Sequence, residues 1–217
     1  MTKKEIQRLR TMKYFIDAAN NIIEEEGIEK VTIRKVADIA GYNSATIYNY
    51  FENLDHLMFY CSMKYLKNYA FRLPKELVTD KGGVEKFLST WFVFSGESFK
   101  NPAIFYSLFF SKFSSNFNGA VKDYYGMFPE NLSSMPEEFM PMMLERNIYQ
   151  RDYRALELCA KEGYLRNDDL KEINEMIMLM YQSMLLRLNN QEMDCSSEEA
   201  VEKIIKYIRV ILANYLL

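Results

Sequence analysis

The chain has 217 residues, a formal net charge of −3 and 49% hydrophobic residues, with 8 glycines and 5 prolines. This balance excludes a disordered chain, a collagen-like repeat and a polybasic tail protein, and the length suffices for a buried core in one large or two small domains. Frequent Met, Leu, Ile, Glu and Lys, with few Gly and Pro, favour helix, so we expect an all-α protein.

The first predicted helix covers 5–26, where apolar residues recur at helical spacing. Gly27 suits a left-handed residue just past the end of this helix. A short second helix is predicted over 33–40 behind Thr32, an N-cap candidate, and Gly41 breaks it.

A third helix is predicted over 44–51, with Asn43 as its N-cap. Asn53 then begins a longer helix over 54–73, which we expect Pro74 to end because proline lacks a backbone donor.

After Pro74, Phe, Tyr and Met become dense and basic residues become fewer. This change predicts two domains, 1–54 and 55–217, joined by the long helix. The segment 115–141 holds three of the five prolines and is expected to be loop-rich and mobile. Further helices are predicted over 84–99, 103–114, 142–165, from Asp168 or Asp169 to 188, and over 197–216, where Ser196 and Glu199 form a capping box.

Residues 32–51 read as a helix-turn-helix, in which two short helices meet at a glycine. The second helix of such a motif presents its first residues to base edges in the major groove. Ile47 and Phe51, at i and i+4, are expected to face inward. The N-termini behind Thr32 and Asn43 are expected to point backbone N–H groups at an anion.

Here the chain resembles the TetR family of bacterial transcriptional regulators over roughly residues 8–58. The residues that carry the resemblance are Phe15 to Gly27, Thr32-Ile33-Arg34, Val36-Ala37, Ala40-Gly41, Thr46 to Phe51, Asn53 and Leu57. The resemblance implies an N-terminal three-helix helix-turn-helix domain, joined by a continuous helix to a C-terminal helical ligand-binding and dimerisation domain. It also implies a homodimeric repressor that leaves a palindromic operator when it binds a small molecule.

Hydroxyl, amide and methyl groups in the motif suit phosphate and base-edge contacts. The predicted DNA-binding residues are Thr32, Arg34, Asn43, Ser44, Ala45, Thr46, Tyr48, Asn49 and Tyr50. Five basic residues fall within 3–13 against Glu5 alone, so the N-terminal arm is expected to contact phosphates although residues 1–54 are neutral overall.

Three positions depart from the family pattern. Ala45 replaces the usual glycine or proline, and Tyr42 replaces a small aliphatic residue, so its ring must lie in the turn or over the DNA backbone. Leu54 replaces the usual lysine, which removes one phosphate contact, and Asp55 beside it adds repulsion.

The aromatic and Met side chains of the second domain either fill its core or line an effector pocket. The resemblance implies such a pocket, and pockets of this kind are mostly apolar. The candidate effector-binding residues are Trp91, Phe92, Phe105, Phe109, Tyr153 and Met178. Residues 87–118 carry many phenylalanines and only three charges, Glu97, Lys100 and Lys112, so we expect an apolar or aromatic effector.

The last two predicted helices are apolar nearly all round, which requires burial on several sides. They are buried either within one subunit or in a four-helix bundle between two subunits, which we favour. The residues assigned to this homodimer interface are Ile177, Met184, Ile204, Ile208 and Ile211.

No enzyme is expected, because His56 is the only histidine and no phosphate-binding glycine loop occurs. We expect no cofactor and no metal, since Cys61, Cys159 and Cys195 lack the spacing of a zinc site or a disulfide framework. Without a signal peptide or a spanning segment, the chain is expected to be cytoplasmic and away from membranes.

Two rival functions remain open: a small-molecule binding protein with a weak DNA-binding domain, and a regulator controlled by a protein partner or acting by activation. The neutral N-terminal charge and Leu54 motivate the first rival.

Overall fold

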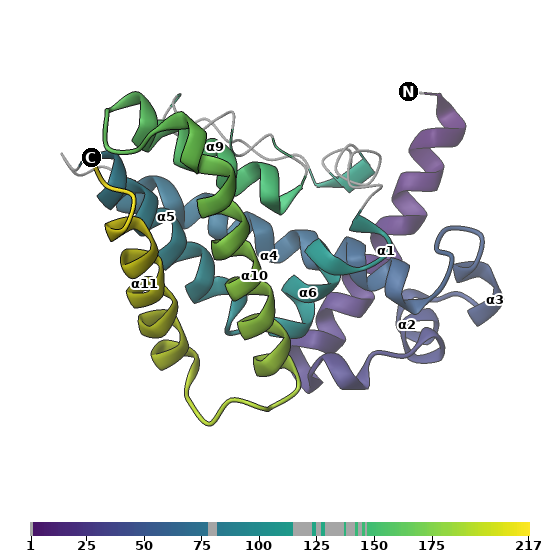
Figure 1. The fold of residues 1–217 in the computed structure, drawn as a ribbon. Helices are drawn as coiled ribbons and strands as arrows, with labels where there is room; N and C mark the ends of the chain where they lie inside the picture. Colours follow the sequence, from purple (N-terminus) through teal and green to yellow (C-terminus); the bar gives the residue numbers. More distant parts are fainter. Residues whose placement is uncertain are drawn as a thin grey trace. The chain divides into compact units, whose positions relative to one another are not determined.

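The computed structural model describes residues 2–77, 82–114, 123, 124, 127, 128, 137, 142, 145 and 147–217. The regular elements of these residues are all helices, so the all-α prediction is confirmed (Figure 1). Most of the predicted loop 115–141 lies outside the described residues.

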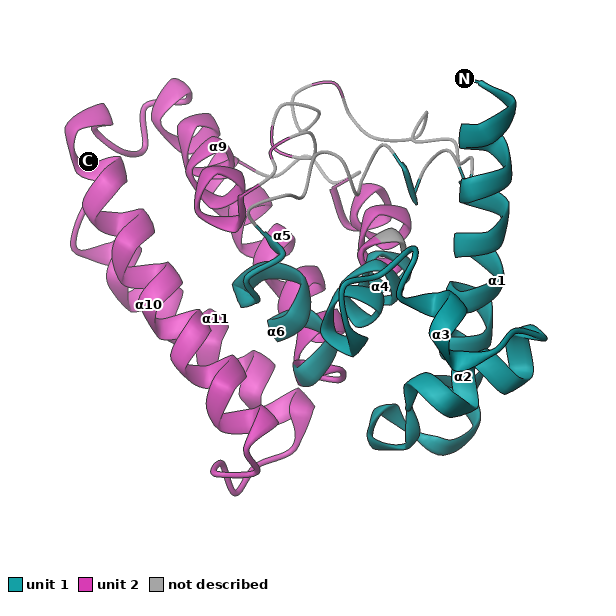
Figure 2. Cartoon of the chain, turned by 90° about the vertical axis from the view of Figure 1, so that its right-hand side faces the viewer, with its two compact units in different colours: residues 1–65, 103–130 teal, residues 66–102, 131–217 magenta. Residues whose placement is uncertain are grey.

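By its internal contacts the chain forms two compact units (Figure 2). Unit 1 comprises residues 1–65 and 103–130, and unit 2 comprises residues 66–102 and 131–217. The described part of 103–130 therefore belongs with the N-terminal helices, an association that the predicted domains 1–54 and 55–217 do not contain.

Unit 1 is built on α1 (Lys3–Glu26), which packs against α2 (Ile33–Ala40), and α2 packs in turn against α3 (Ser44–Ile47). A 3-10 turn, η1 (Ile28–Lys30), connects α1 to α2, and α6 (Pro102–Phe110) lies later in the chain. The core of unit 1 consists of apolar side chains that include Met12, Phe15, Ile16, Ala19, Val36, Ile47, Phe51 and Leu57.

The ends of α1 follow from local chemistry. Thr2 accepts a hydrogen bond from the Glu5 N–H, and the Glu5 carboxylate accepts one from the Thr2 N–H, so this capping box starts the helix earlier than predicted. Gly27 ends the helix with φ of 98°, a backbone conformation that glycine adopts without strain.

The helix α4 (Leu54–Leu77) runs through Pro74, so the prediction that this proline ends the helix is wrong. Leu73 and Leu77 lie at i and i+4 and are both buried. We attribute the extension to this burial, which offsets the loss of one backbone hydrogen bond. At the other end, Asn53 Oδ1 accepts the His56 N–H at 2.9 Å and caps the helix as predicted.

Unit 2 contains α5 (Gly83–Ser98), α9 (Ile148–Lys161), α10 (Leu170–Asn189) and α11 (Ser197–Ala213), with a 3-10 turn, η4 (Asn167–Asp169), before α10. In this unit α5 packs against α9 and α11, and α10 packs against the same two helices. A buried core is therefore enclosed by four helices and the second half of α4.

Two helix ends in unit 2 show how a local signal decides a boundary. The helix α9 ends at Lys161 and not at 165, because Gly163 adopts φ of 83° and reverses the chain. Ser196 and Glu199 form the predicted capping box at the start of α11.

Candidate DNA-binding surface and effector cavity

A left-handed glycine makes the turn between α2 and α3. Gly41 has φ of 78° and ψ of 27°, and the following N–H of Tyr42 donates to the Ala37 carbonyl at 2.9 Å. A side chain at this position would be strained, so glycine allows the chain to leave α2 at a sharp angle. This is the junction that the helix-turn-helix prediction requires.

The helix α3 is short and strongly capped. Asn43 Oδ1 accepts from the Ala45 N–H at 2.7 Å and from the Thr46 N–H at 3.2 Å. Regular α-helix ends at Ile47, and residues 48–50 continue as hydrogen-bonded turns instead of the predicted helix to 51.

The two faces of this segment differ in burial. Ile47 and Phe51 are buried, as their spacing predicts, and Phe51 meets the Phe15 ring edge to face at 6.3 Å. On the other face Tyr48 is 57% exposed, and Asn43, Ala45 and Asn49 are exposed as well. The apolar side therefore fixes the segment to α1 while the polar side faces solvent.

Two tyrosines of the motif pack inside unit 1. The ring of Tyr42 lies 5.1 Å from that of Phe15, so it occupies the turn, one of the two positions that the sequence left open. The ring of Tyr50 lies 5.9 Å from the same phenylalanine, and Tyr50 is only half-exposed.

The caps of α2 and α3 take backbone N–H groups that are predicted to face an anion. Thr32 Oγ1 accepts the Lys35 N–H at 3.2 Å, and Asn43 takes the Ala45 and Thr46 donors. The caps therefore leave fewer backbone N–H groups unpaired at these two helix ends, and the nearby Arg34 side chain is exposed.

Several basic side chains of unit 1 form ion pairs with neighbouring carboxylates. Arg8 pairs with Asp123 at 3.0 Å, Lys13 pairs with Asp17 at 2.8 Å, and Lys35 pairs with Glu26. The basic residues of α1 and α2 that form no ion pair within the described part of the chain are Lys3, Lys4, Arg10 and Arg34.

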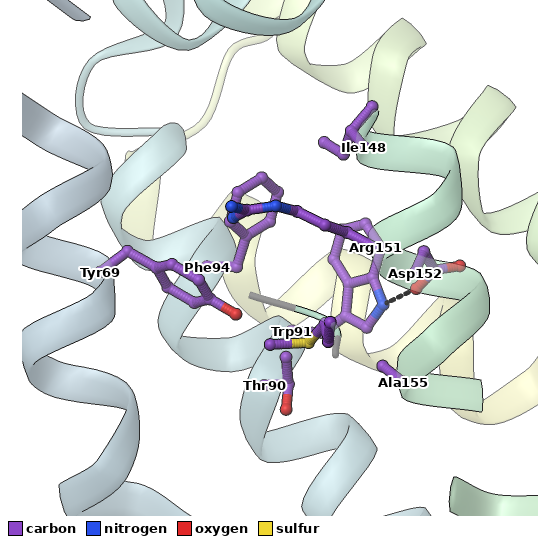
Figure 3. A pocket seen from close by; sticks show the side chains of 9 residues that line it. Tyr69, Thr90, Trp91, Phe94, Ile148, Arg151, Asp152 and Ala155 are labelled. Carbon is purple, nitrogen blue, oxygen red and sulfur yellow. Dashed lines mark hydrogen bonds between the residues drawn. The ribbon is translucent and has the colours of Figure 1, made fainter. Parts of the chain in front are cut away.

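Unit 2 contains a small cavity of about 30 Å³, shown in Figure 3. Its walls come from α4, α5, α9 and Met142, which precedes α9, and they are mostly apolar and aromatic. The lining residues are Tyr69, Thr90, Trp91, Phe94, Met142, Ile148, Arg151, Asp152 and Ala155.

A buried hydrogen bond crosses this cavity wall. The Trp91 indole N–H donates to Asp152 Oδ1 at 2.8 Å, and Figure 3 shows the two groups facing each other. The Trp91 ring also packs against Phe94 at 5.6 Å and against Tyr181 at 5.3 Å.

Residues 15–61 match the model of the family described as bacterial regulatory proteins, tetR family. This range contains the end of α1, all of α2 and α3, the glycine turn and the start of α4. Residues 15–61 therefore belong to the TetR family. No curated protein matches its sequence.

Solved structures of TetR-family regulators have the same fold. A TetR-family repressor, FadR from Thermus thermophilus, solved with lauroyl-CoA, is 14% identical with a TM-score of 0.59, and the match covers 91% of this chain and 92% of that one. A TetR-family regulator from Mesorhizobium loti is 11% identical with a TM-score of 0.56, and the match covers 100% of both chains.

A third similar structure is that of SmeT, the repressor of the Stenotrophomonas maltophilia multidrug efflux pump SmeDEF. It is 14% identical with a TM-score of 0.54, over 95% of this chain and 90% of that one. These matches extend the likeness from the helix-turn-helix to nearly the whole chain, at the level of the fold.

The candidate effector residues of this TetR-type chain occupy different places. Trp91 lines the cavity, whereas Phe92, the next residue on α5, is 51% exposed. Phe105 and Phe109 are buried in unit 1, Met178 is buried in unit 2 away from the cavity lining, and Tyr153 is half-buried. Within the described residues, the cavity thus contains Trp91 alone of this set.

The candidate dimer residues are mostly covered by their own unit. Ile177, Met184, Ile204 and Ile208 are buried in the single chain, and Ile211 is half-buried. The large apolar side chains that these two helices expose are Leu179, Leu186, Tyr207 and Val210.

Asp152 lines the cavity but was not predicted from the sequence, although its spacing along α9 indicates a buried position. Ile148, Asp152, Ala155 and Cys159 follow the i, i+4, i+7, i+11 spacing of one helical face, and all four are buried. An acidic residue within such a stripe marks a carboxyl group that the fold buries.

None of the helices among the described residues is both long and apolar enough to cross a bilayer. No group of three or more His, Cys, Asp or Glu side chains in those residues is arranged to hold a metal ion.

Proposed function

We propose that this TetR-type chain is a transcriptional repressor that binds a palindromic operator as a homodimer and leaves it when a small apolar or aromatic effector binds unit 2. The observation that carries the proposal is the solvent-facing side of α3, which lies opposite the buried Ile47 and Phe51 in the segment that the family model matches. Tyr48, Asn49 and Ala45 offer a phenol, an amide and a methyl group to the major groove.

The phosphate contacts would come from the basic residues that have no acidic partner in the described chain. Arg34 lies in the first turn of α2, and Lys3, Lys4 and Arg10 lie on α1. Because Arg8, Lys13 and Lys35 already pair with carboxylates, we expect a moderate dependence of DNA binding on salt.

The effector would bind the cavity around Trp91. Tyr69 lines this cavity from α4, and α4 is a single helix that begins shortly after α3. If a ligand binds the chain more tightly with α4 in one position than in another, it shifts the population toward the first position. The size of the shift is set by the difference between the two affinities. Lauroyl-CoA in the Thermus thermophilus repressor is a ligand with a long apolar chain, and it motivates an apolar class here.

The homodimer would form through the exposed apolar side chains of α10 and α11. Leu179 and Val210 are each 57% exposed, and Leu186 and Tyr207 lie on the same two helices. Pairing these helices with those of a second copy gives a four-helix bundle that covers them. As a DNA-binding regulator without an enzymatic role, the protein would act in the cytoplasm.

A rival function is a small-molecule binding protein whose DNA-binding domain is weak. The ion pairs of Arg8, Lys13 and Lys35 favour it, because they reduce the charge available to phosphates.

An electrophoretic shift assay separates the two functions. The probe is duplex DNA from upstream of the chain's own gene, titrated with n-alkylbenzenes while Trp91 fluorescence is recorded. The repressor proposal predicts DNA binding that is lost over the same concentrations at which Trp91 responds. A Trp91 response without any DNA binding would favour the rival.

A further inference from the structure

Asp152 is a buried carboxyl group in the wall of an aromatic cavity. Its side chain is 7% exposed, and one oxygen accepts the Trp91 indole N–H at 2.8 Å. The other oxygen, Oδ2, has no hydrogen-bond partner among the described residues. A buried polar atom without a partner lowers stability, so a ligand group that pairs with Oδ2 would remove this cost.

The charged neighbour in the cavity does not supply this donor. Arg151 precedes Asp152 on α9, and its Nε donates to the Glu145 carbonyl at 2.9 Å. Asp152 Oδ2 accepts no hydrogen bond from Arg151. Figure 3 shows the guanidinium directed away from the carboxylate.

Asp152 keeps its proton near neutral pH because its carboxyl group is buried. The titratable groups that line the cavity or pack against it are Tyr69 from α4, Arg151 and Cys159 from α9, and Tyr181 from α10. Burial raises the pKa of Asp152 to about 8, and the hydrogen bond from Trp91 acts in the opposite direction.

Aromatic rings form the rest of the wall. Tyr69 meets Phe94 edge to face at 5.4 Å, and Phe94 meets Trp91 edge to face at 5.6 Å. Ring faces attract cations, most strongly where water is excluded. A protonated amine on an apolar body would therefore find both the Asp152 carboxyl group and aromatic surface in one place.

The cavity of about 30 Å³ has room for water-sized groups only, whereas sites for drug-sized ligands measure about 300–1,000 Å³. A ligand must therefore displace side chains from the wall. Met142 has a long, flexible side chain that can change rotamer, so the cavity would open as the ligand enters.

We propose that Asp152 is the polar anchor of the effector site and binds the protonated amine of an otherwise apolar ligand. The inference rests on the proposed effector-controlled function and specifies its ligand class. On binding, the ammonium N–H donates to Oδ2, the Asp152 carboxyl group loses its proton to water, and Oδ1 keeps the hydrogen bond from Trp91. One proton is released for each amine bound wherever the free carboxyl group is protonated.

Three probes that share a phenylalkyl body test the proposal. They are 4-phenylbutylamine, pentylbenzene and 5-phenylpentanoate, which carry a cation, no charge and an anion. Trp91 fluorescence gives each affinity, and calorimetry in two buffers of different ionisation enthalpy counts protons at pH 7. The amine is expected to bind at least tenfold more tightly than pentylbenzene and to release close to one proton.

Two variants assign the effect to the carboxyl group. Asp152→Asn keeps an acceptor for Trp91, and should abolish the proton release and the preference for the amine while binding pentylbenzene as before. Thr90→Val is the matched control, because it removes a polar group from the same wall, and its hydroxyl donates to the Lys86 carbonyl of its own helix. This control should keep the preference for the amine.

Each other outcome has a defined meaning. Equal affinity for the amine and pentylbenzene, or an unchanged preference in Asp152→Asn, overturns the inference and leaves an apolar effector site. Tighter binding of 5-phenylpentanoate, lost in Arg151→Gln, overturns it in favour of an anionic ligand. A silent Trp91 with all three probes contradicts both the inference and the effector part of the proposed function.

Discussion

Tyr48 is the most exposed large hydrophobic side chain of the helix-turn-helix, and its phenol is free to reach a base edge or a phosphate. Tyr48→Ala should weaken operator binding by about 1–3 kcal/mol, the value of one good specific contact. Tyr14→Ala on α1 removes a ring of similar exposure, 56%, and serves as the control in the same binding assay. Equal affinities for Tyr48→Ala and the parent would exclude this side chain from the DNA contact.

Asp152 should make stability depend on pH. Burial raises its pKa to about 8 in the folded chain, above the ordinary value of 3.8. The folded state therefore holds a proton that the unfolded state releases, and this stabilisation is full below pH 4 and disappears as pH rises to 8.

Urea unfolding at pH 5, 6, 7 and 8 tests this dependence. Compared with Asp152→Asn, the parent should lose up to about 1.4 kcal/mol per pH unit over this window. Other titrating groups, including His56, are common to both proteins and cancel in the difference. Parallel pH profiles for the two proteins would show that the carboxyl group is not protonated in the folded state.

The contacts of single side chains were the hardest feature to predict from the sequence. The inward positions of Ile47 and Phe51 followed from their spacing. His56 gave no such signal: its ring stacks on Phe113 at 4.6 Å, and its Nδ1 accepts the Glu52 N–H at 3.1 Å. The partner Phe113 is remote in the chain, and a pattern that is local in sequence carries no information about it.

Helix boundaries were predictable where a cap marks them. Thr32, Asn43, Asn53 and Ser196 all cap the helices that they were expected to begin. A predicted boundary was wrong where a tertiary interaction opposed a local preference. At Pro74 the proline favours a helix end, but the buried leucines before and after it keep α4 helical.

The cap of α3 gives a prediction at this scale. Asn43→Ala removes the acceptor for two backbone N–H groups and should cost about 1 kcal/mol of stability. Asn43→Asp keeps the acceptor and should restore most of this loss in thermal unfolding. An alanine variant as stable as the parent would mean that packing of Ile47 alone defines the helix.

At the scale of the molecule, the apolar pattern of the last two helices did not distinguish the core from an interface. Ile204 and Ile208 are covered within the chain, whereas Leu179 and Val210 remain exposed. Both sets are apolar, and only the position of α5 and α9 around these helices separates them.

The exposed set provides the test of assembly. Val210→Glu places a charge where two copies of α11 would meet, and it should yield monomers that remain folded because Val210 is exposed in the single chain. Ile6→Glu, on the exposed side of α1, is the matched control and should leave assembly unchanged. Sedimentation of an intact Val210→Glu dimer would place the interface on another surface.

The most direct test of a DNA-binding regulator is the affinity of the purified chain for duplex DNA as a function of salt. The probes are a labelled duplex from upstream of its own gene and an unrelated duplex of equal length. We expect tighter binding to the upstream duplex and a linear fall of log affinity with log salt, because the basic side chains displace counterions. Equal affinity for both duplexes, or binding that salt does not weaken, would contradict the proposed function.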